Sequence, residues 1–188
     1  MYGKKLIYPY TTGSSHEDIH IFYKALYSGG FMPLKKLKEY LNSNNIKFVT
    51  ITHSSAFTAQ EIAAQAHIPG KVLAKTVLIK INGKMAMAVL PASDKVDFDL
   101  LKQAIGNENI RLAYEQEFMD KFPDCEVGAM PPFGNLYGMD VYVAKDLTSD
   151  EEIAFNACSH SELVKMSYKD FERLVKPVVL DFSFQSML

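Results

Sequence analysis

The chain has 188 residues, of which 48% are hydrophobic and 22% are charged, values that fit one soluble domain with a substantial core. Its apolar runs are too short to span a bilayer, and its N-terminus lacks the continuous apolar stretch of a signal peptide. The net charge of −2 argues against indiscriminate nucleic-acid binding. Two cysteines without a C-x-x-C motif, Cys125 and Cys158, predict reduced thiols in a cytoplasmic protein.

Residues 1–31 are predicted to form an N-terminal extension that carries one short helix. Ser15 and Asp18 make a capping-box pattern, and apolar residues follow them at helical spacing. The extension ends at the flexible break Ser28–Gly30. We expect the helix to dock on the main domain or on a second subunit, which leaves both a monomer and a homodimer open.

Within this extension, His16–His20 reads H-E-x-x-H, the signature of zinc metallopeptidases. On a helix the two histidines would share a face, with Glu17 as general base. The extension has no room for the sheet that backs such a helix, and Gly29–Gly30 and Pro33 separate it from Glu39, the residue at third-ligand spacing. We therefore interpret the histidines as surface residues and predict no metal site.

Residues 32–180 are predicted to form the main domain, and residues 181–188 a tail. Capping signals and apolar stripes predict helices over Pro33–Leu41, Thr58–His67, Asp97–Ile105, Tyr114–Phe122 and Ser167–Val175. Apolar and β-branched runs predict strands over Ile46–Thr52, Val72–Ile81, Lys84–Leu90, Ile110–Ala113, Met139–Val143, Ile153–Asn156 and Glu162–Met166. Asn82–Gly83 predicts a hairpin turn. This order favours an α+β fold with a mixed, partly barrel-like central sheet flanked by helices.

Lys75 is the most informative residue of the predicted strands. Because strand side chains alternate, it shares an apolar face with Val77, Ile79 and Ile81. An ammonium there needs a partner or a pocket, since burial of an unpaired charge is costly. A lysine at a strand end can also extend into water. The strand alone therefore leaves a structural and a functional lysine open.

A second signal lies downstream, in the G-x-x-x-P segment Gly128–Pro132. Gly128 permits a close backbone approach, and Pro131 and Pro132 stiffen the loop, so its N–H groups can be aimed at one point. Such donors suit the oxyanion that forms when an ester is attacked.

The lysine strand and the G-x-x-x-P loop together resemble the YbaK/aminoacyl-tRNA-synthetase-associated domain family, which hydrolyses mischarged aminoacyl-tRNA. The resemblance runs from about Met32 to Pro177 and includes His53–Glu61, Met85–Pro91 and Cys158–Phe171. It implies a YbaK-like fold, similar to the prolyl-tRNA synthetase editing domain, and a cytoplasmic deacylase that acts in trans in translation fidelity. The implied substrate is the 3′ end of aminoacyl-tRNA, with an aminoacyl-tRNA synthetase as a further candidate partner and no cofactor.

The resemblance also implies the site. Lys75 would bind the terminal adenosine phosphate or the ester's carbonyl region, and Gly128 would serve the oxyanion. The nucleophile would be a water oriented by the tRNA 2′-hydroxyl. Substrate contacts are expected from His53, Thr58, Ala129, Met130, Pro131, Pro132, Phe133 and His160, with Phe133 as a pocket wall. A small pocket would reject larger side chains, as a second sieve does.

There are three alternatives to this interpretation. A nucleophile pair of Ser54 or Ser55 with His53 lacks a G-x-S-x-G elbow, and Cys158 near His160 is better explained as a packed residue. The stronger alternative is a non-catalytic module of the same fold that binds a ligand or an aminoacyl-tRNA synthetase. Retention of both the lysine and the glycine favours the enzyme.

Overall fold

The computed structural model describes residues 33–53, 68, 71–107, 109–123 and 125–185, which lie within one compact unit, Pro33–Leu188. The helices expected within residues 1–31 and over Thr58–His67, and the H-E-x-x-H segment, lie outside the described residues. Of the helices that are described, none combines the length and apolar character needed to cross a membrane.

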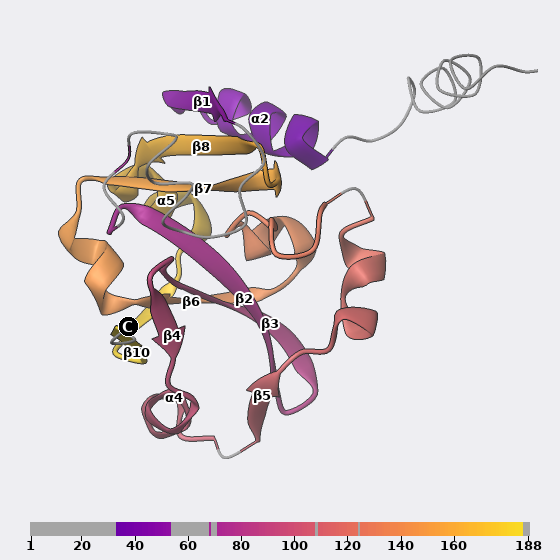
Figure 1. Ribbon diagram of the computed structural model, residues 1–188, viewed down its shortest axis with the longest axis vertical. Coiled ribbons are helices and arrows are strands. Elements are labelled where there is room, and N and C mark those ends of the chain that lie inside the picture. Colours follow the sequence, from indigo (N-terminus) through magenta and orange to yellow (C-terminus); the bar gives the residue numbers. More distant parts are fainter. Residues whose placement is uncertain (1–32, 54–67, 69–70, 108, 124, 186–188) are drawn as a thin grey trace, which may run out of the picture. The chain divides into compact units, whose positions relative to one another are not determined.

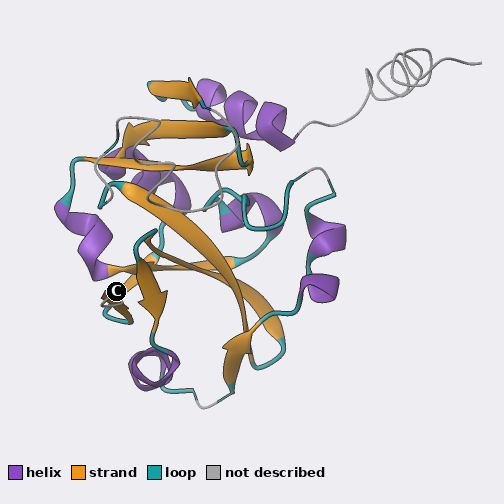
Figure 2. Ribbon diagram, in the orientation of Figure 1, coloured by secondary structure: helices purple, strands orange, loops and turns teal. Residues whose placement is uncertain are grey.

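The described part contains three α-helices and one large mixed sheet (Figures 1 and 2). The helices are α2 (Pro33–Ser43), α4 (Phe98–Ile105) and α5 (Tyr168–Val175). The sheet strands are β1 (Phe48–Thr52), β2 (Leu73–Ile81), β3 (Lys84–Pro91), β5 (Ile110–Leu112), β6 (Asp140–Ala144), β7 (Glu152–Ser159), β8 (Glu162–Ser167) and β9 (Val178–Leu180). Two further strands, β4 (Asp94–Val96) and β10 (Ser183–Gln185), form a separate antiparallel pair.

The large sheet runs in the order β1–β8–β7–β2–β3–β6–β9, with β5 paired to β2. Pairing is parallel for β7 with β2, β3 with β6 and β6 with β9, and antiparallel elsewhere. The sheet curls strongly, so that β7 and β8 lie across the direction of β2 and β3 (Figure 1). The predicted α+β class with a mixed, partly barrel-like sheet is confirmed.

Local sequence signals account for several elements. The β2–β3 hairpin turns at Asn82 and Gly83, both left-handed with φ of 50° and 79°, as the turn signal predicted. Asp97 caps α4 by accepting from the N–H groups of Asp99 and Leu100. Gly106 ends the same helix with φ of 70°.

The two faces of β2 enter different cores. Ala74 and Leu78 face a large cluster that also buries Phe133, Phe155 and Phe171, whose rings pack 5.6 Å apart around Phe133. On the opposite face, Val77, Ile79 and Ile81 pack in a second cluster with Leu101 and Phe182. The predicted alternation of β2, with Lys75 on the Ile79 face, therefore holds.

The predicted α-helix over Tyr114–Phe122 is wrong, because two 3₁₀ turns, η1 (Glu115–Glu117) and η2 (Met119–Lys121), occupy this segment. The Glu117 carboxylate accepts from the Tyr114 N–H and closes the first turn. Phe118 then leaves helical geometry, with φ of −130° and ψ of −15°. The sequence also missed β4, β9 and β10. Ser183–Gln185, within the expected tail, pairs with β4.

Candidate active site

The parallel contact between β2 and β7 is short, and Lys75 and Asn156 directly follow it on the two strands. The two strands pair only at Leu73 with Ala154 and at Ala74 with Phe155. β2 then diverges from β7 (Figure 1). Farther along β7, the Cys158 N–H donates to the Ala129 carbonyl, and the Cys158 carbonyl accepts from the Glu126 N–H. The G-x-x-x-P segment therefore pairs with β7 beyond the point at which β2 leaves it.

Lys75 stands at this point of divergence. Its ammonium donates to the Ala92 carbonyl at 3.2 Å, and the described residues provide no carboxylate within salt-bridge distance of it. Partial burial removes the ammonium from water and so lowers the pKa of Lys75, an effect that nearby Asp94 partly offsets. The Asp94 carboxylate is itself buried and accepts from the Ser93 and Ser183 hydroxyls.

Asn156 is a further candidate residue, which the sequence did not suggest. It follows Phe155 on β7 as Lys75 follows Ala74 on β2, so the in-register pair places both side chains on the face opposite the large core. Directly across β8, Asn156 pairs with Leu163, which packs with Leu73 and Ala154. Its Oδ1 is buried and has no hydrogen-bond partner in the described part of the chain. A lone carboxamide within an apolar strand was the available signal.

Gly128 is where the G-x-x-x-P loop reaches the surface. Its φ of 88° is left-handed, and an added Cβ would lie 3.5 Å from Cε1 of His160. The neighbouring Ala129 N–H donates to the Glu126 carbonyl, whereas the Gly128 N–H makes no hydrogen bond with any residue that the structure describes. This donor is available at an exposed position beside His160.

The rest of the loop is not placed as expected. Ala129, Met130, Pro131, Pro132 and Phe133 are all buried. Phe133 in particular points into the large core, where it packs on Phe155 and Phe171, so the structure gives no support to the prediction that it forms a pocket wall. The second proline and the aromatic ring anchor the loop and leave only its first residues at the surface.

The two candidate histidines lie on adjoining segments. His53 follows β1, and its N–H donates to Ser161 in the β7–β8 turn at 2.9 Å. In the same turn, Nε2 of His160 bonds the Val127 carbonyl at 2.9 Å, which requires this nitrogen to donate. The His160 N–H donates to the Glu126 carboxylate. His160 therefore holds the loop that presents Gly128. Thr58 lies outside the described residues.

Cys125 and Cys158 form a disulfide, so the expectation of reduced, unpaired thiols is wrong. Their Cα atoms lie 4.2 Å apart, although 33 residues separate them in sequence. The bond joins the residue before Glu126 to the bulged part of β7, where Cys158 has φ of 67°. It fastens the Gly128 loop to β7 next to the backbone hydrogen bonds described above.

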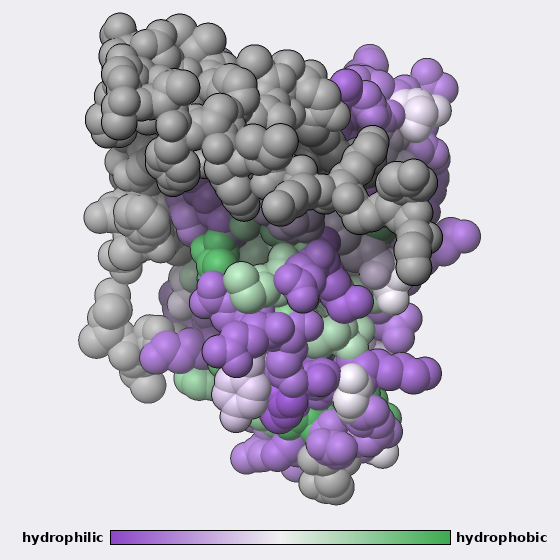
Figure 3. Space-filling model, turned by 90° about the vertical axis from the view of Figure 1, so that its right-hand side faces the viewer, coloured by the Kyte–Doolittle hydropathy of each residue, from purple (hydrophilic) through white to green (hydrophobic). Residues whose placement is uncertain are grey.

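A surface cavity of about 310 Å³ adjoins the outer side of this loop. It is lined by Glu115, Phe118, Met119, Asp120, Phe122, Pro123, Cys125, Val127 and Met130. Figure 3 shows one side of the molecule, on which hydrophobic patches lie among hydrophilic side chains. Val127, the neighbour of Gly128, and Met119 are about half exposed, at 51% and 49%.

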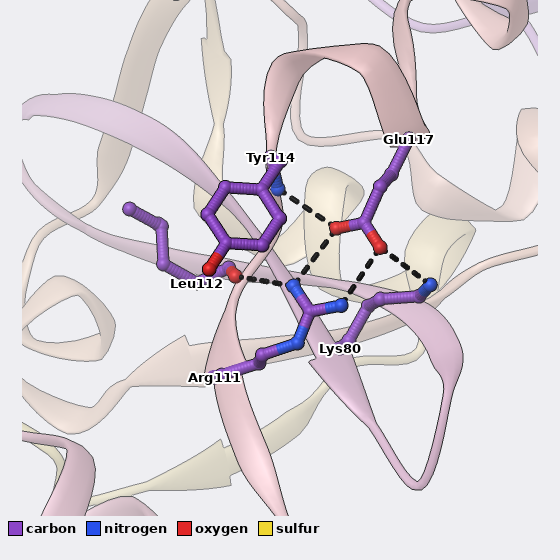
Figure 4. Close-up of polar contacts among 5 residues, drawn as sticks. All are labelled: Lys80, Arg111, Leu112, Tyr114 and Glu117. Atoms are coloured by element: carbon purple, nitrogen blue, oxygen red, sulfur yellow. Dashed lines mark hydrogen bonds and ion pairs between the residues drawn. The ribbon is translucent and has the colours of Figure 1, made fainter.

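A cluster of charged side chains lies farther along β2, away from the β7 contact. Glu117 accepts from Lys80 at 2.8 Å and from both Arg111 terminal nitrogens at 2.7 and 2.8 Å, and Arg111 also stacks on Tyr114 (Figure 4). These hydrogen bonds hold the pKa of Glu117 well below its usual range and raise that of Arg111. Within the described part, no group of three or more acidic, histidine or cysteine side chains could hold a metal.

Comparison with known proteins identifies a family and several relatives of this chain. The model of the family described as aminoacyl-tRNA editing domain matches residues 53–174. Multifunctional Ser/Thr-tRNA deacylase ProXp-y of Escherichia coli K12 is 27% identical over 162 residues, which cover 81% of this chain and 94% of that protein. Prolyl-tRNA editing protein ProX of Acetoanaerobium sticklandii is 25% identical over 142 residues, covering 72% and 86% of the two chains.

Two solved structures share the fold. Hypothetical protein APE2540 superposes with a TM-score of 0.71 at 20% identity, over 79% of this chain and 99% of its own. A candidate trans-editing enzyme for prolyl tRNA synthetase gives a TM-score of 0.70 at 17% identity, over 81% and 97%. Since the family model covers most of the chain, and sequence relatives and fold agree with it, the chain belongs to the aminoacyl-tRNA editing domain family.

Proposed function

We propose that the protein is a hydrolase that deacylates mischarged aminoacyl-tRNA in trans, with a site built around Lys75, Gly128 and the β7–β8 turn. The observation that carries this proposal is a partly buried lysine without a carboxylate partner among the described residues, on a strand that pairs with β7. Farther along, β7 bonds the loop of Gly128, a left-handed glycine whose N–H has no hydrogen-bond partner in the described part of the chain. Family membership supports it, and the E. coli relative is named as a Ser/Thr-tRNA deacylase.

In the proposed reaction, Lys75 binds an acceptor of the substrate, either the terminal adenosine phosphate or the ester carbonyl region. Its ammonium is suited to this because the Ala92 carbonyl orients it without neutralising its charge. A side-chain carboxylate at salt-bridge distance would compete with the substrate for the same charge. Partial burial strengthens the interaction, since fewer waters screen it.

The Gly128 N–H is the proposed oxyanion donor. As a water attacks the ester carbon, the carbonyl oxygen gains negative charge, and a donor already fixed in place stabilises it without reorganisation. His160 and the Cys125–Cys158 disulfide supply that fixation. The described site residues offer no evident general base, so we propose that the tRNA 2′-hydroxyl orients the attacking water. The ester bond breaks to release the free amino acid and an uncharged tRNA.

Discrimination is proposed to be steric, as in a second sieve, with His53 and His160 bordering the aminoacyl pocket. The charge distribution fits a substrate held mainly at its 3′ end, since a net charge of −2 disfavours broad contact with the tRNA body. We further propose that the protein works in the cytoplasm, where charged tRNAs are found, as a monomer or homodimer and without a cofactor.

The test is a deacylation panel. Pure protein is incubated with several tRNAs charged with serine, threonine, alanine and larger amino acids, and ester loss is followed against a no-enzyme control. We expect rapid loss of one or a few small aminoacyl esters and no loss of the larger ones. No hydrolysis of any ester by folded protein would contradict the proposal and favour a non-catalytic module that binds a ligand or a synthetase.

A further inference from the structure

The proposed reaction gives no role to Asn156. Its Oδ1 is buried, yet it has no hydrogen-bond partner among the described residues. Leaving a buried acceptor unpaired is costly, and such atoms in folded proteins usually have a specific explanation. The acceptor also lies in apolar surroundings, opposite Leu163 and on the face that carries Leu73 and Ala154. A ligand that brings a donor to this point would remove the cost.

The position of Asn156 narrows down what that ligand is. It follows the last β2–β7 residue pair on β7, as Lys75 follows it on β2, at the point where β2 leaves β7 and the Gly128 loop takes over pairing with β7. Lys75 and the Gly128 N–H are both hydrogen-bond donors, so they take the acceptor atoms of a substrate. Asn156 Oδ1 is an acceptor, so it takes a donor atom of the same substrate.

At the ester end of an aminoacyl-tRNA the donors are the α-ammonium and the free ribose hydroxyl beside the ester. The ammonium is charged, and hydrogen bonds to charged groups are the stronger kind. A carboxylate would also bind an ammonium, but beside Lys75 it would form an ion pair, as Glu117 does with Lys80. A neutral carboxamide accepts from the ammonium and leaves the charge of Lys75 available.

We propose that Asn156 is the residue that recognises the α-ammonium of the aminoacyl group, a role that rests on the proposed function. Through this contact the site reads a feature common to all aminoacyl esters and turns the ester carbonyl toward Gly128. The remaining walls of the pocket then select the side chain of the amino acid by its size. Asn156 is thus a positioning residue that fixes the substrate's orientation.

The test compares the rates at which Asn156→Ala and wild type hydrolyse matched pairs of esters. One member is an aminoacyl-tRNA, and the other is the same tRNA after chemical deamination to the α-hydroxyacyl form. Wild type should hydrolyse the aminoacyl ester at least about tenfold faster than its hydroxyacyl partner, and the variant should lose most of this preference. Asn135→Ala removes a carboxamide in the η3 turn (Gly134–Tyr137), where it bonds Tyr40, and should keep the preference.

Stability separates this role from a structural one. Because Oδ1 makes no bond to a described residue, Asn156→Ala should melt at or above the wild-type temperature. A preference that survives in a folded variant would overturn the proposal. So would a loss of rate equal for both esters, or a loss that disappears when the terminal ribose lacks its free hydroxyl, since that would assign Oδ1 to the ribose.

A binding measurement tests the role of Asn156 separately from the proposed hydrolysis. The probes are 3′-(L-alanylamino)-3′-deoxyadenosine and its L-lactylamino counterpart, whose amides resist hydrolysis, and binding is measured by calorimetry. Wild type should bind the alanyl probe at least about tenfold more tightly, and Asn156→Ala should bind the two alike. Equal binding by wild type overturns the role of Asn156 even if deacylation is found. Preferential binding without any deacylation overturns the hydrolase and retains the ammonium site.

Discussion

Lys75 and Lys80 lie on the same strand but in opposite electrostatic situations. Lys80 donates to Glu117, which also accepts from Arg111, so two cations share this carboxylate and Lys80 has an ion-pair partner within the fold (Figure 4). Lys75 has a backbone carbonyl as its partner, and burial lowers the pKa of its ammonium. A lysine that is ion-paired within the fold stabilises structure, whereas a lysine without a carboxylate at salt-bridge distance among the described residues is suited to bind an anionic group of a ligand.

The largest expected effect comes from removing each lysine in turn. Lys75→Ala should lower the deacylation rate by about 10³-fold or more, since it removes the cation proposed to contact the substrate. Lys80→Ala should change the rate less than about threefold, because its partners are Glu117 and solvent. Initial rates at saturating tRNA measure both. Similar rate losses in the two variants would remove the distinction between the lysines.

Gly128→Ala tests the other half of the site. The φ of 88° makes any side chain there unfavourable by about 1–2 kcal/mol, and the new methyl group would touch His160. We expect a rate loss of about tenfold to 10³-fold from the misplaced oxyanion donor. Gly138→Ala is the matched control, since Gly138 is also left-handed, with φ of 66°, and has open space around it.

The control should share the stability loss and retain the rate. If the two glycine variants lose activity in the same proportion as stability, Gly128 is a turn residue without a part in the reaction.

Reduction of the Cys125–Cys158 bond should have a smaller effect. The bond constrains the segment that presents Gly128, so its loss should lower the free energy of unfolding by about 2–4 kcal/mol and the rate a few-fold. Melting and initial rates with and without dithiothreitol measure this. The double variant Cys125→Ser/Cys158→Ser should resemble reduced wild type and should not respond to the reductant. If dithiothreitol changed neither the melting temperature nor the initial rate of wild type, the expectation would be contradicted.

The lowered pKa of Lys75 predicts opposite trends of stability and binding at alkaline pH. Its folded-state pKa lies below the unfolded value of 10.5, so the folded state binds fewer protons between these values and its stability rises with pH there. Over the same window the Lys75 ammonium is lost, and binding of the L-lactylamino probe, which has no titrating amine of its own, should weaken by several-fold. Lys75→Met should remove both trends, as measured by calorimetry and chemical denaturation. Parallel trends in wild type would contradict the assignment.

The smallest effect is expected for Glu117→Gln. The wild-type carboxylate has a lowered pKa, so its stabilising contribution is complete above the unfolded pKa and is lost as pH falls through the folded one. The variant should melt slightly below wild type at neutral pH and match it in strong acid. Its deacylation rate should be unchanged. A marked loss of rate would place the Lys80 cluster in the function.

The parts of the fold that could be predicted from sequence are those set by short-range signals. Asn82–Gly83 requires two left-handed residues, and Asp97 and Gly106 mark the ends of α4. The Lys75 strand was recognised by its alternation. In contrast, β4 and β10 each have three residues and exist because they pair with one another across a long stretch of chain. No local pattern carries such information.

The site divides in the same way. Lys75 and Gly128 carry their own signals, a charge in an apolar strand and a glycine before two prolines. Asn156 does not, because its importance depends on the register of β2 against β7. The disulfide depends equally on the long-range placement of Cys125 beside β7. The core position of Phe133 could not be predicted, because the motif shows that the loop is stiff but not which of its residues enter the core.

The short parallel contact between β2 and β7 also has a kinetic meaning. Its two residue pairs join parts of the chain separated by about eighty positions, and parallel pairings of this kind are slow to form because a long loop must close first. The β2–β3 hairpin and α4 can form early, since their contacts are local. The β2 strand of Lys75 and the loop of Gly128 both pair with β7, so they take their places only after β7 has been synthesised and docked. A nascent chain that lacks β7 therefore cannot present the proposed site, and its assembly coincides with the completion of folding.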